Sequence, residues 1–167
     1  MSAAITASEA AELLAREGRR LDTRQWEAWL DLYTEDAVYW VPAWKSEAEP
    51  TEDPDRELSL IYYTDREALA DRAWRNRSGL SVAATPLWRT AHAVNNVLLE
   101  PPARDGEAEV RATWTVHCFD PASGRQHVYF GLYEVTLRQG DDGWRIARKK
   151  VLLLNDYIPT VLDVYMM

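Results

Sequence analysis

Apolar residues in the first part of the chain follow a helical spacing. They recur every three or four positions, as in a helix that buries one face, at Ala10, Leu13, Leu14 and Leu21. The preceding segment Thr6–Glu9 fits a capping box, in which the threonine hydroxyl and the glutamate carboxylate each bond a free backbone amide. A second short helix, with Asp22 or Thr23 as its candidate N-cap, is indicated by the shared face of Trp26, Trp29, Leu30 and Tyr33.

After this helical region, the spacing of apolar residues becomes that of extended strands. A turn at Glu35-Asp36 leads into the apolar strand Ala37–Val41, and Leu58–Tyr63 predicts a short strand or a buried segment. Thr64–Glu67 fits another capping box, which opens a third helix through about Arg77.

The second half of the chain predicts four long strands joined by short turns that contain Gly, Pro or Asp. These strands are Trp88–Leu99, Glu107–Phe119, Gln126–Arg138 and Trp144–Asn155. The second of them alternates strictly, with one apolar face made of Val110, Ala112, Trp114, Val116 and Cys118. The third is apolar on both faces, with Val128, Phe130 and Leu132 opposite Tyr129, Tyr133, Val135 and Leu137. A sheet that is apolar on both sides has its second face covered by helices or by a partner.

Helices followed by a long antiparallel meander indicate an α+β fold, in which a strongly curved sheet wraps the N-terminal helices as a cone. The length of 167 residues favours a single domain over residues 1–167. The end of the chain is unusually apolar, since Lys149–Asp156 is a strand signature and Tyr157–Met167 is rich in Leu, Val, Tyr and Met. Either this tail closes the core of its own domain or it docks on another chain.

Composition narrows the classes of partner. The formal net charge of −8 argues against nucleic acid and anionic membranes as partners. Half of that charge falls in Lys45–Glu57, which we interpret as a solvated loop. The single cysteine, Cys118, fits a reducing cytoplasm, and neither a secretory signal at Met1–Ile5 nor a membrane-length apolar run is apparent. Eight tryptophans favour a protein that meets other proteins, because tryptophan is enriched at interfaces.

The residues that could carry chemistry are few. A Rieske cluster needs two cysteines and two histidines, and this chain has one cysteine. The three histidines, His92, His117 and His127, lie on separate predicted strands without metal-ligand spacing, so we expect no metal site. No dinucleotide, phosphate or nucleophile-elbow motif is present, and Cys118 falls in an apolar stripe that favours an inert core thiol.

Two other functions remain open. A curved-sheet cone can carry a general acid–base pair, and Asp36, Tyr39 and His92 are the candidates for a stand-alone dehydratase or isomerase. A plain ligand-binding cone is the third option. It would be disfavoured if the interior were filled by Trp26, Trp29, Trp40 and Trp114.

Several stretches, in this order, resemble one family over most of the chain. The first is Leu21–Ala43, which contains Trp26, Trp29, Tyr33 and the run Asp36–Ala43. The others are Ser59–Arg72, Arg89–Val97, Lys149–Asp156 and Leu162–Tyr165. The sequence resembles the small (β) subunit of aromatic-ring-hydroxylating dioxygenases, most closely the benzoate, toluate and anthranilate branch. The acidic loop and the passage from Ser78 to Pro86 are the least family-like parts.

The resemblance implies a nuclear-transport-factor-like (cystatin-like) cone, mostly antiparallel, and a non-catalytic structural role. It implies that the β subunit forms a trimer that supports three α subunits in an α3β3 hexamer. The α subunit would carry the Rieske [2Fe-2S] cluster, the mononuclear iron and the pocket for an aromatic carboxylate or hydrocarbon. Electrons would come from NADH through a reductase, in some systems by way of a ferredoxin, and the product would be a cis-dihydrodiol.

A structural subunit needs intersubunit contacts, and the later strands and the apolar tail are expected to supply much of them. The candidate polar groups at such an interface are Arg89, His92, Lys149, Lys150 and Asp156. We expect no catalytic, cofactor-binding or metal-binding residue in this chain.

Overall fold

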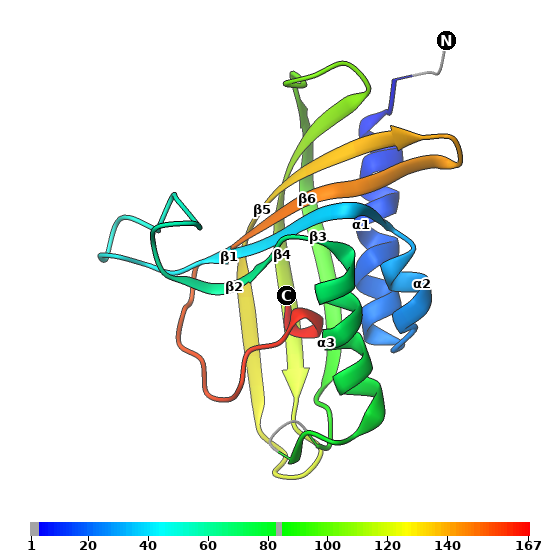
Figure 1. Ribbon diagram of the computed structural model, residues 1–167. Helices are drawn as coiled ribbons and strands as arrows, with labels where there is room; N and C mark the ends of the chain where they lie inside the picture. Colours follow the sequence, from blue (N-terminus) through cyan, green and yellow to red (C-terminus); the bar gives the residue numbers. More distant parts are fainter. Residues whose placement is uncertain (1–3, 83–84) are drawn as a thin grey trace.

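The computed structural model describes residues 4–82 and 85–167 (Figure 1). Its helices are α1 (Ala7–Asp22), α2 (Trp26–Leu30), α3 (Arg66–Ser78) and the short 3-10 helix η2 (Val164–Met166). Its strands are β1 (Tyr33–Pro42), β2 (Ser59–Tyr63), β3 (Arg89–Glu100), β4 (Glu107–Phe119), β5 (Gln126–Gly140) and β6 (Gly143–Leu153). Met1–Ala3 of the predicted N-terminal stretch and residues 83–84 of the Ser78–Pro86 passage lie outside the described residues.

The strands form one sheet in the order β2-β1-β6-β5-β4-β3. Every neighbouring pair is antiparallel except β1 and β6, which run parallel. The sheet curves around the helices, which lie together on one side of it, and the C-terminal segment enters the opening between them (Figure 1). The predicted α+β cone with a mostly antiparallel sheet is confirmed. No helix among the described residues is long and apolar enough to cross a membrane.

The helix starts agree with the sequence in one case and differ in two. The capping box of α1 is present, with the Thr6 amide 2.8 Å from the Glu9 carboxylate. The predicted cap of α2 is wrong, because Gln25 occupies that position and Asp22 is the last residue of α1. At α3 the cap is Asp65, whose carboxylate accepts the Ala68 amide at 2.8 Å, one residue later than the start of the predicted box.

Strand β1 begins earlier than predicted. Tyr33 is its first residue and pairs with Ile146 of β6, so it does not belong to the face of α2. The Ile146 amide also bonds the carbonyl of Leu32 at 2.7 Å. This long-range pairing overrides the local turn signal at Glu35-Asp36, and both residues lie within the strand. The acidic segment Lys45–Glu57 is a projecting loop between β1 and β2, as predicted (Figure 1).

The faces of β4 and β5 are those that the alternation predicted. The β4 stripe from Val110 to Cys118 is buried, and so are the inward side chains of β5. On the other side of β5, Val128, Phe130 and Leu132 are 37–44% exposed. One face of the sheet therefore closes the core of the chain, and the opposite face leaves apolar side chains in solvent.

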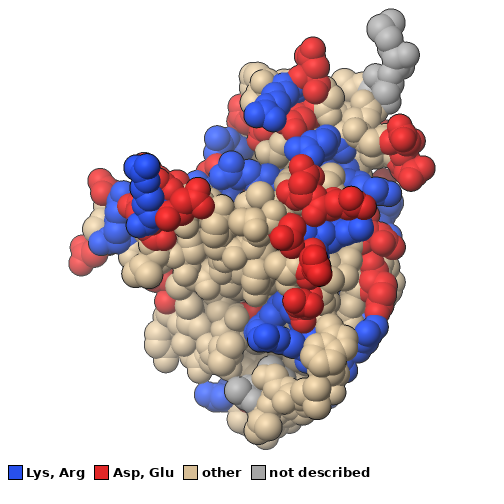
Figure 2. Space-filling model, viewed as in Figure 1, with Lys and Arg blue, Asp and Glu red and all other residues tan. Residues whose placement is uncertain are grey.

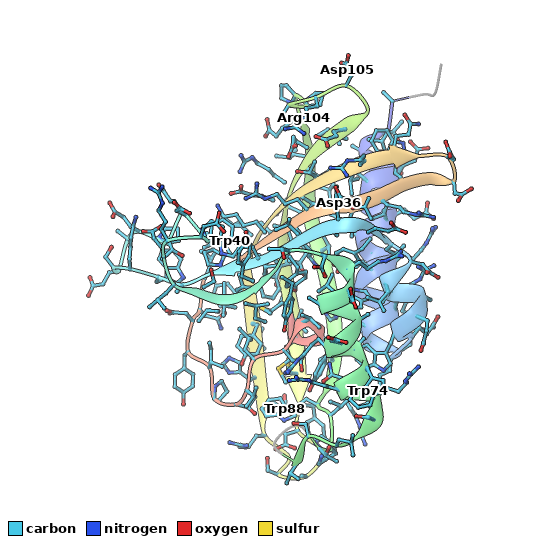
Figure 3. All side chains as sticks on the ribbon, in the orientation of Figure 1. Asp36, Trp40, Trp74, Trp88, Arg104 and Asp105 are labelled. Carbon is cyan, nitrogen blue, oxygen red and sulfur yellow. The ribbon has the colours of Figure 1, made fainter. Side chains whose placement is uncertain are left out.

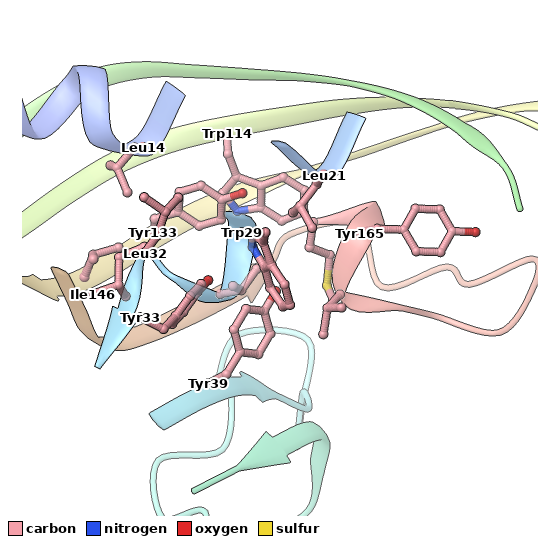
Figure 4. Packing of buried hydrophobic residues seen from close by; sticks show 14 of the residues in the cluster. Leu14, Leu21, Trp29, Leu32, Tyr33, Tyr39, Trp114, Tyr133, Ile146 and Tyr165 are labelled. Carbon is pink, nitrogen blue, oxygen red and sulfur yellow. The ribbon is translucent and has the colours of Figure 1, made fainter. Parts of the chain in front are cut away.

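Aromatic rings fill much of the inside of the cone (Figure 4). Trp114 stacks on Tyr133 with ring centroids 5.3 Å apart, and Trp29 meets Tyr33 edge-on at 5.3 Å. Trp26 also belongs to this core, whereas Trp40 is buried on the opposite side of β1, so three of the four tryptophans that would disfavour a ligand-binding cone lie in the core. The described tryptophans are mostly covered by their own chain, and Trp74 on α3 is the one that is more than half exposed (Figure 3).

The C-terminal segment closes its own core. Val164, Tyr165, Met166 and Met167 are all buried. Asp163, just before η2, accepts two hydrogen bonds from the Arg72 guanidinium at 3.0 and 2.6 Å and one from the Asn76 amide at 3.2 Å. These bonds hold the segment against α3. The sequence left open whether the apolar tail closes its own core or docks on another chain, and residues 163–167 close the core.

Candidate functional site

The cone contains a buried ion pair at its centre. The Lys149 ammonium lies 2.6 Å from one carboxylate oxygen of Glu17, and neither side chain has more than 2% of its surface exposed. The other oxygen accepts the Tyr33 hydroxyl at 2.5 Å and the Trp29 indole N–H at 3.2 Å. The Tyr133 ring lies 4.1 Å from the ammonium, which adds a cation–π contact.

The charges and hydrogen bonds around Glu17 decide its protonation. Burial alone would raise the pKa of Glu17, but the charge of Lys149 and the hydrogen bonds from Lys149, Tyr33 and Trp29 hold it below its ordinary value. Burial lowers the pKa of Lys149, while the charge of Glu17 acts against that shift, and the Lys149, Tyr33 and Trp29 donors are all engaged by the carboxylate. The pair links α1 to β6, 132 residues apart in the sequence.

Glu17 was not among the residues predicted from the sequence, although its position carries a signal. Glu17 lies on the apolar stripe of α1, between Leu14 and Leu21. Lys149 likewise has the inward parity of Val151 and Leu153 on β6. A single acid and a single base on facing apolar stripes predict a buried pair, because neither charge is tolerated there alone.

His92 forms a second internal pair, with Asp22. The ring Nδ1 lies 2.5 Å from the Asp22 carboxylate, and the backbone amide of His92 donates to the other carboxylate oxygen at 3.0 Å. The ring Nε2 lies 3.2 Å from the main-chain oxygen of Met167. The dyad therefore joins α1, β3 and the C-terminal segment, and both ring nitrogens already have partners inside the chain.

The predicted acid–base set of Asp36, Tyr39 and His92 is not brought together. Asp36 is exposed on β1 and pairs with Arg138 at 2.8 Å (Figure 3). Tyr39 is fully buried, and burial raises the pKa of its hydroxyl well above the ordinary value. The prediction is wrong because β1 begins before Asp36 and leaves its side chain at a solvent-exposed position of the strand, whereas His92 is bound by Asp22.

The thiol of Cys118 is not a reactive group. Cys118 is buried, and desolvation raises the pKa of its thiol to about 12, so the thiolate is scarce at neutral pH. Among residues 4–82 and 85–167, no three His, Cys, Asp or Glu side chains lie close enough together to hold a metal ion. The residues present do not fit a Rieske cluster or a mononuclear iron site.

The five predicted interface residues divide by burial. Lys149 has no exposed surface, and the His92 side chain is 4% exposed, so both are engaged within the chain. Arg89 is exposed over the Phe119 ring, Lys150 is half-buried over Trp40, and Asp156 borders a surface groove next to Trp44. For these last three, an intersubunit role stays a prediction.

The outer face of the sheet has two contrasting halves. Next to the β5–β6 turn it carries ion pairs, such as Arg111 with Glu134 and Arg138 with Glu107. The other half carries mostly apolar and uncharged polar side chains, together with the exposed imidazole of His117, and the exposed Arg89 lies in the next outward row. Its paired rows across β3, β4 and β5 are Ala91, His117 and Val128; Ala93, Thr115 and Phe130; and Asn95, Thr113 and Leu132.

Comparison with known proteins gives the family. The model of the ring-hydroxylating β-subunit family matches residues 16–160. The chain is 41% identical to the β subunit of toluate 1,2-dioxygenase from Pseudomonas putida over 92% of this chain and 93% of the relative. It is 38% identical to the β subunit of benzoate 1,2-dioxygenase from Acinetobacter baylyi, over 96% and 94%.

A solved structure agrees with this relationship. The crystal structure of the benzoate 1,2-dioxygenase β subunit from Burkholderia mallei superposes with a TM-score of 0.82 at 33% identity, and the match covers 99% of this chain and 100% of the other. The sequence match and the shared cone lead to the same assignment: this chain belongs to the ring-hydroxylating dioxygenase β-subunit family.

Proposed function

We propose that this chain is the non-catalytic structural subunit of a Rieske non-haem iron dioxygenase that acts on an aromatic carboxylate. The observation that carries the proposal is the family match together with a cone interior occupied by its own side chains. Its role is to hold a larger α subunit in place, in an α3β3 hexamer that contains three copies of each subunit.

The division of labour follows from the side chains. A ring dihydroxylation that uses both atoms of O2 needs electrons delivered through a metal centre, and this chain supplies no matching ligand set among its described residues. We assign the Rieske cluster, the mononuclear iron and the substrate pocket to the α subunit. We further propose that NADH supplies the electrons through a reductase, with or without a ferredoxin, and that the assembly works in the cytoplasm.

The substrate class comes from the relatives. Both curated relatives are named for benzoate or for toluate, its methyl derivative, and each of these is a benzene ring that bears a carboxylate. We therefore propose a benzoate-like substrate and a cis-dihydrodiol product. The choice among aromatic acids depends on the pocket of the α subunit.

Co-expression with a candidate α subunit from the same genome tests the proposal. Three preparations, this chain alone, the α subunit alone and both together, are assayed for iron, for benzoate-dependent O2 uptake and for mass. We expect iron only where the α subunit is present, and full turnover only in a complex that contains both chains. Bound iron or benzoate turnover by this chain alone would overturn the proposal, as would failure of the two chains to co-purify.

A further inference from the structure

One end of the molecule is basic, although the chain as a whole carries a formal net charge of −8. No acid occurs in the sequence between Asp71 and Glu100. Within this stretch, Arg75 lies in the last turn of α3, and its guanidinium has neither a hydrogen bond nor an ion pair with any described residue. Arg24, in the turn between α1 and α2, belongs to the same end, because its guanidinium donates to the Leu87 carbonyl at 3.2 Å.

Exposed apolar side chains lie among these arginines. Trp74 on α3 is 51% exposed, and Leu80, just beyond the left-handed Gly79 that ends α3, is 71% exposed. We call Arg24, Trp74, Arg75 and Leu80 the basic tip. Figure 3 places Trp74 toward the lower end of α3, and around that end Figure 2 shows basic and uncharged side chains. Tryptophan and arginine are the residue types that contribute most binding energy at protein interfaces.

The position of Arg75 at a helix end does not account for the whole tip. A base in the last turn of a helix is stabilised by the helix dipole, which explains an arginine at this place. The dipole gives no reason for Trp74 and Leu80 to stay in solvent. Large apolar side chains that are grouped in solvent and flanked by charges mark an interaction surface.

A shallow groove between α2 and α3 adjoins Trp74. Its apolar lining consists of Trp26, Leu30, Ala70, Ala73 and Trp74. Of the two acids at its rim, Glu27 and Asp71, the first is already paired with Arg77. The groove therefore offers an apolar partner side chain a place next to the basic tip.

The charge reverses along α3, which limits the direction of approach. Beside the first turn of α3 the groove continues between four acids, which Figure 2 shows as a cluster above the basic tip: Asp31, Glu35, Asp65 and Glu67. An acidic partner is repelled there and attracted at the Arg75 end, because like charges that face each other oppose binding.

We infer that the basic tip docks an acidic segment of a partner protein, with an apolar side chain of that segment against Trp74. Nucleic acid does not fit, because its long row of phosphates would also meet the acids at the other end of α3. The passage from Ser78 to Pro86, which includes Leu80, is among the least family-like parts of the sequence, so a partner other than the α subunit fits best. The inference thus goes beyond the proposed function.

A labelled peptide tests this docking surface. The probe is a fluorescein-labelled peptide of leucine and glutamate, and peptides with glutamine or lysine in place of glutamate are its controls. Binding is measured by fluorescence anisotropy to the full-length chain, alone and in complex with the candidate α subunit. Arg75→Glu and Leu80→Ala are compared with Arg56→Glu and Leu58→Ala. These two controls carry the same changes at side chains that are 87% and 80% exposed, at the projecting loop.

We expect the glutamate peptide to bind the wild type, and the glutamine peptide to bind about tenfold more weakly or not at all. Arg75→Glu and Leu80→Ala should each weaken binding of the glutamate peptide by about tenfold or more, and the two loop variants by less than about twofold. Circular dichroism melting confirms that each variant is folded.

Three results would overturn the inference. The first is a wild type that does not bind the glutamate peptide, or that binds the lysine peptide as well. The second is an equal loss of binding in the tip variants and the loop variants. The third is loss of binding once the α subunit is present, which would show that the α subunit covers the basic tip and would leave the proposed function intact.

Discussion

At the scale of single residues, the buried pair of Glu17 and Lys149 is the most consequential feature. Removing one partner leaves an uncompensated charge in an apolar core, whereas removing both does not. Lys149→Met should therefore lower the free energy of unfolding by about 3–5 kcal/mol. The double variant Glu17→Gln/Lys149→Met should be more stable than Lys149→Met, since the glutamine oxygen can still accept from Tyr33 and Trp29.

Urea titration of the wild type, both single variants and the double variant measures this coupling. An exposed lysine offers a control: Lys45→Met removes a charge that lies 3.5 Å from Glu57 on the projecting loop, and should change stability by less than about 1 kcal/mol. Additive effects at positions 17 and 149 would contradict the proposed pairing.

Gly131 is required by the close approach of two strands. A Cβ atom at this position would lie 1.8 Å from the backbone carbonyl oxygen of Leu152 and 3.1 Å from the Trp114 indole nitrogen. Gly131→Ala must therefore move β5 away from β6, and should lower stability by about 2–3 kcal/mol or more. Gly140→Ala, on the same strand, meets nothing closer than 3.6 Å and serves as the control. Equal denaturation midpoints for the two variants would show that the strands have room to separate.

At the scale of elements, Asp163 joins the C-terminal segment to α3. Asp163→Ala removes the acceptor for Arg72 and Asn76 and frees the cap of η2, so we expect a loss of about 2–4 kcal/mol. Limited proteolysis followed by mass spectrometry should show early cleavage within Tyr157–Met167 in this variant. Asp156→Ala, at an exposed position before the same segment, should be cleaved like the wild type.

The sequence predicted the elements well, and its errors have identifiable causes. The long strands, the α1 cap and the two faces of β5 were predictable because they depend on local periodicity. The start of β1 at Tyr33 was not, because its pairing partner Ile146 lies far away in the chain. The prediction of an acid–base pair between Asp36 and His92 was wrong for the same reason, because only the folded topology places Asp22 beside His92.

At the scale of the whole molecule, acid should weaken the fold through its internal carboxylates. Burial of Asp22 opposes ionisation, but bonds from His92 and Thr90 hold its pKa below the ordinary value of 3.8, and the pKa of Glu17 is likewise lowered. A depressed pKa means that the unfolded chain takes up protons first as the pH falls. The stabilisation is therefore complete above about pH 5 and is lost progressively below the ordinary pKa values.

Urea midpoints measured from pH 3 to pH 7 test this expectation. Asp22→Asn should be less stable than the wild type at pH 7 and should lose less stability on acidification. A variant curve parallel to that of the wild type would mean that Asp22 carries no share of the acid sensitivity.

The parallel pairing of β1 with β6 has a consequence for biosynthesis. Tyr39 of β1 cannot pair with Lys149 of β6 until β6, more than a hundred residues later, has left the ribosome. Until then the N-terminal helices and β1 lack their central neighbour, and contacts this distant in sequence form slowly. Nascent chains should therefore keep these elements incompletely packed until β6 has emerged, and should need protection by chaperones until then.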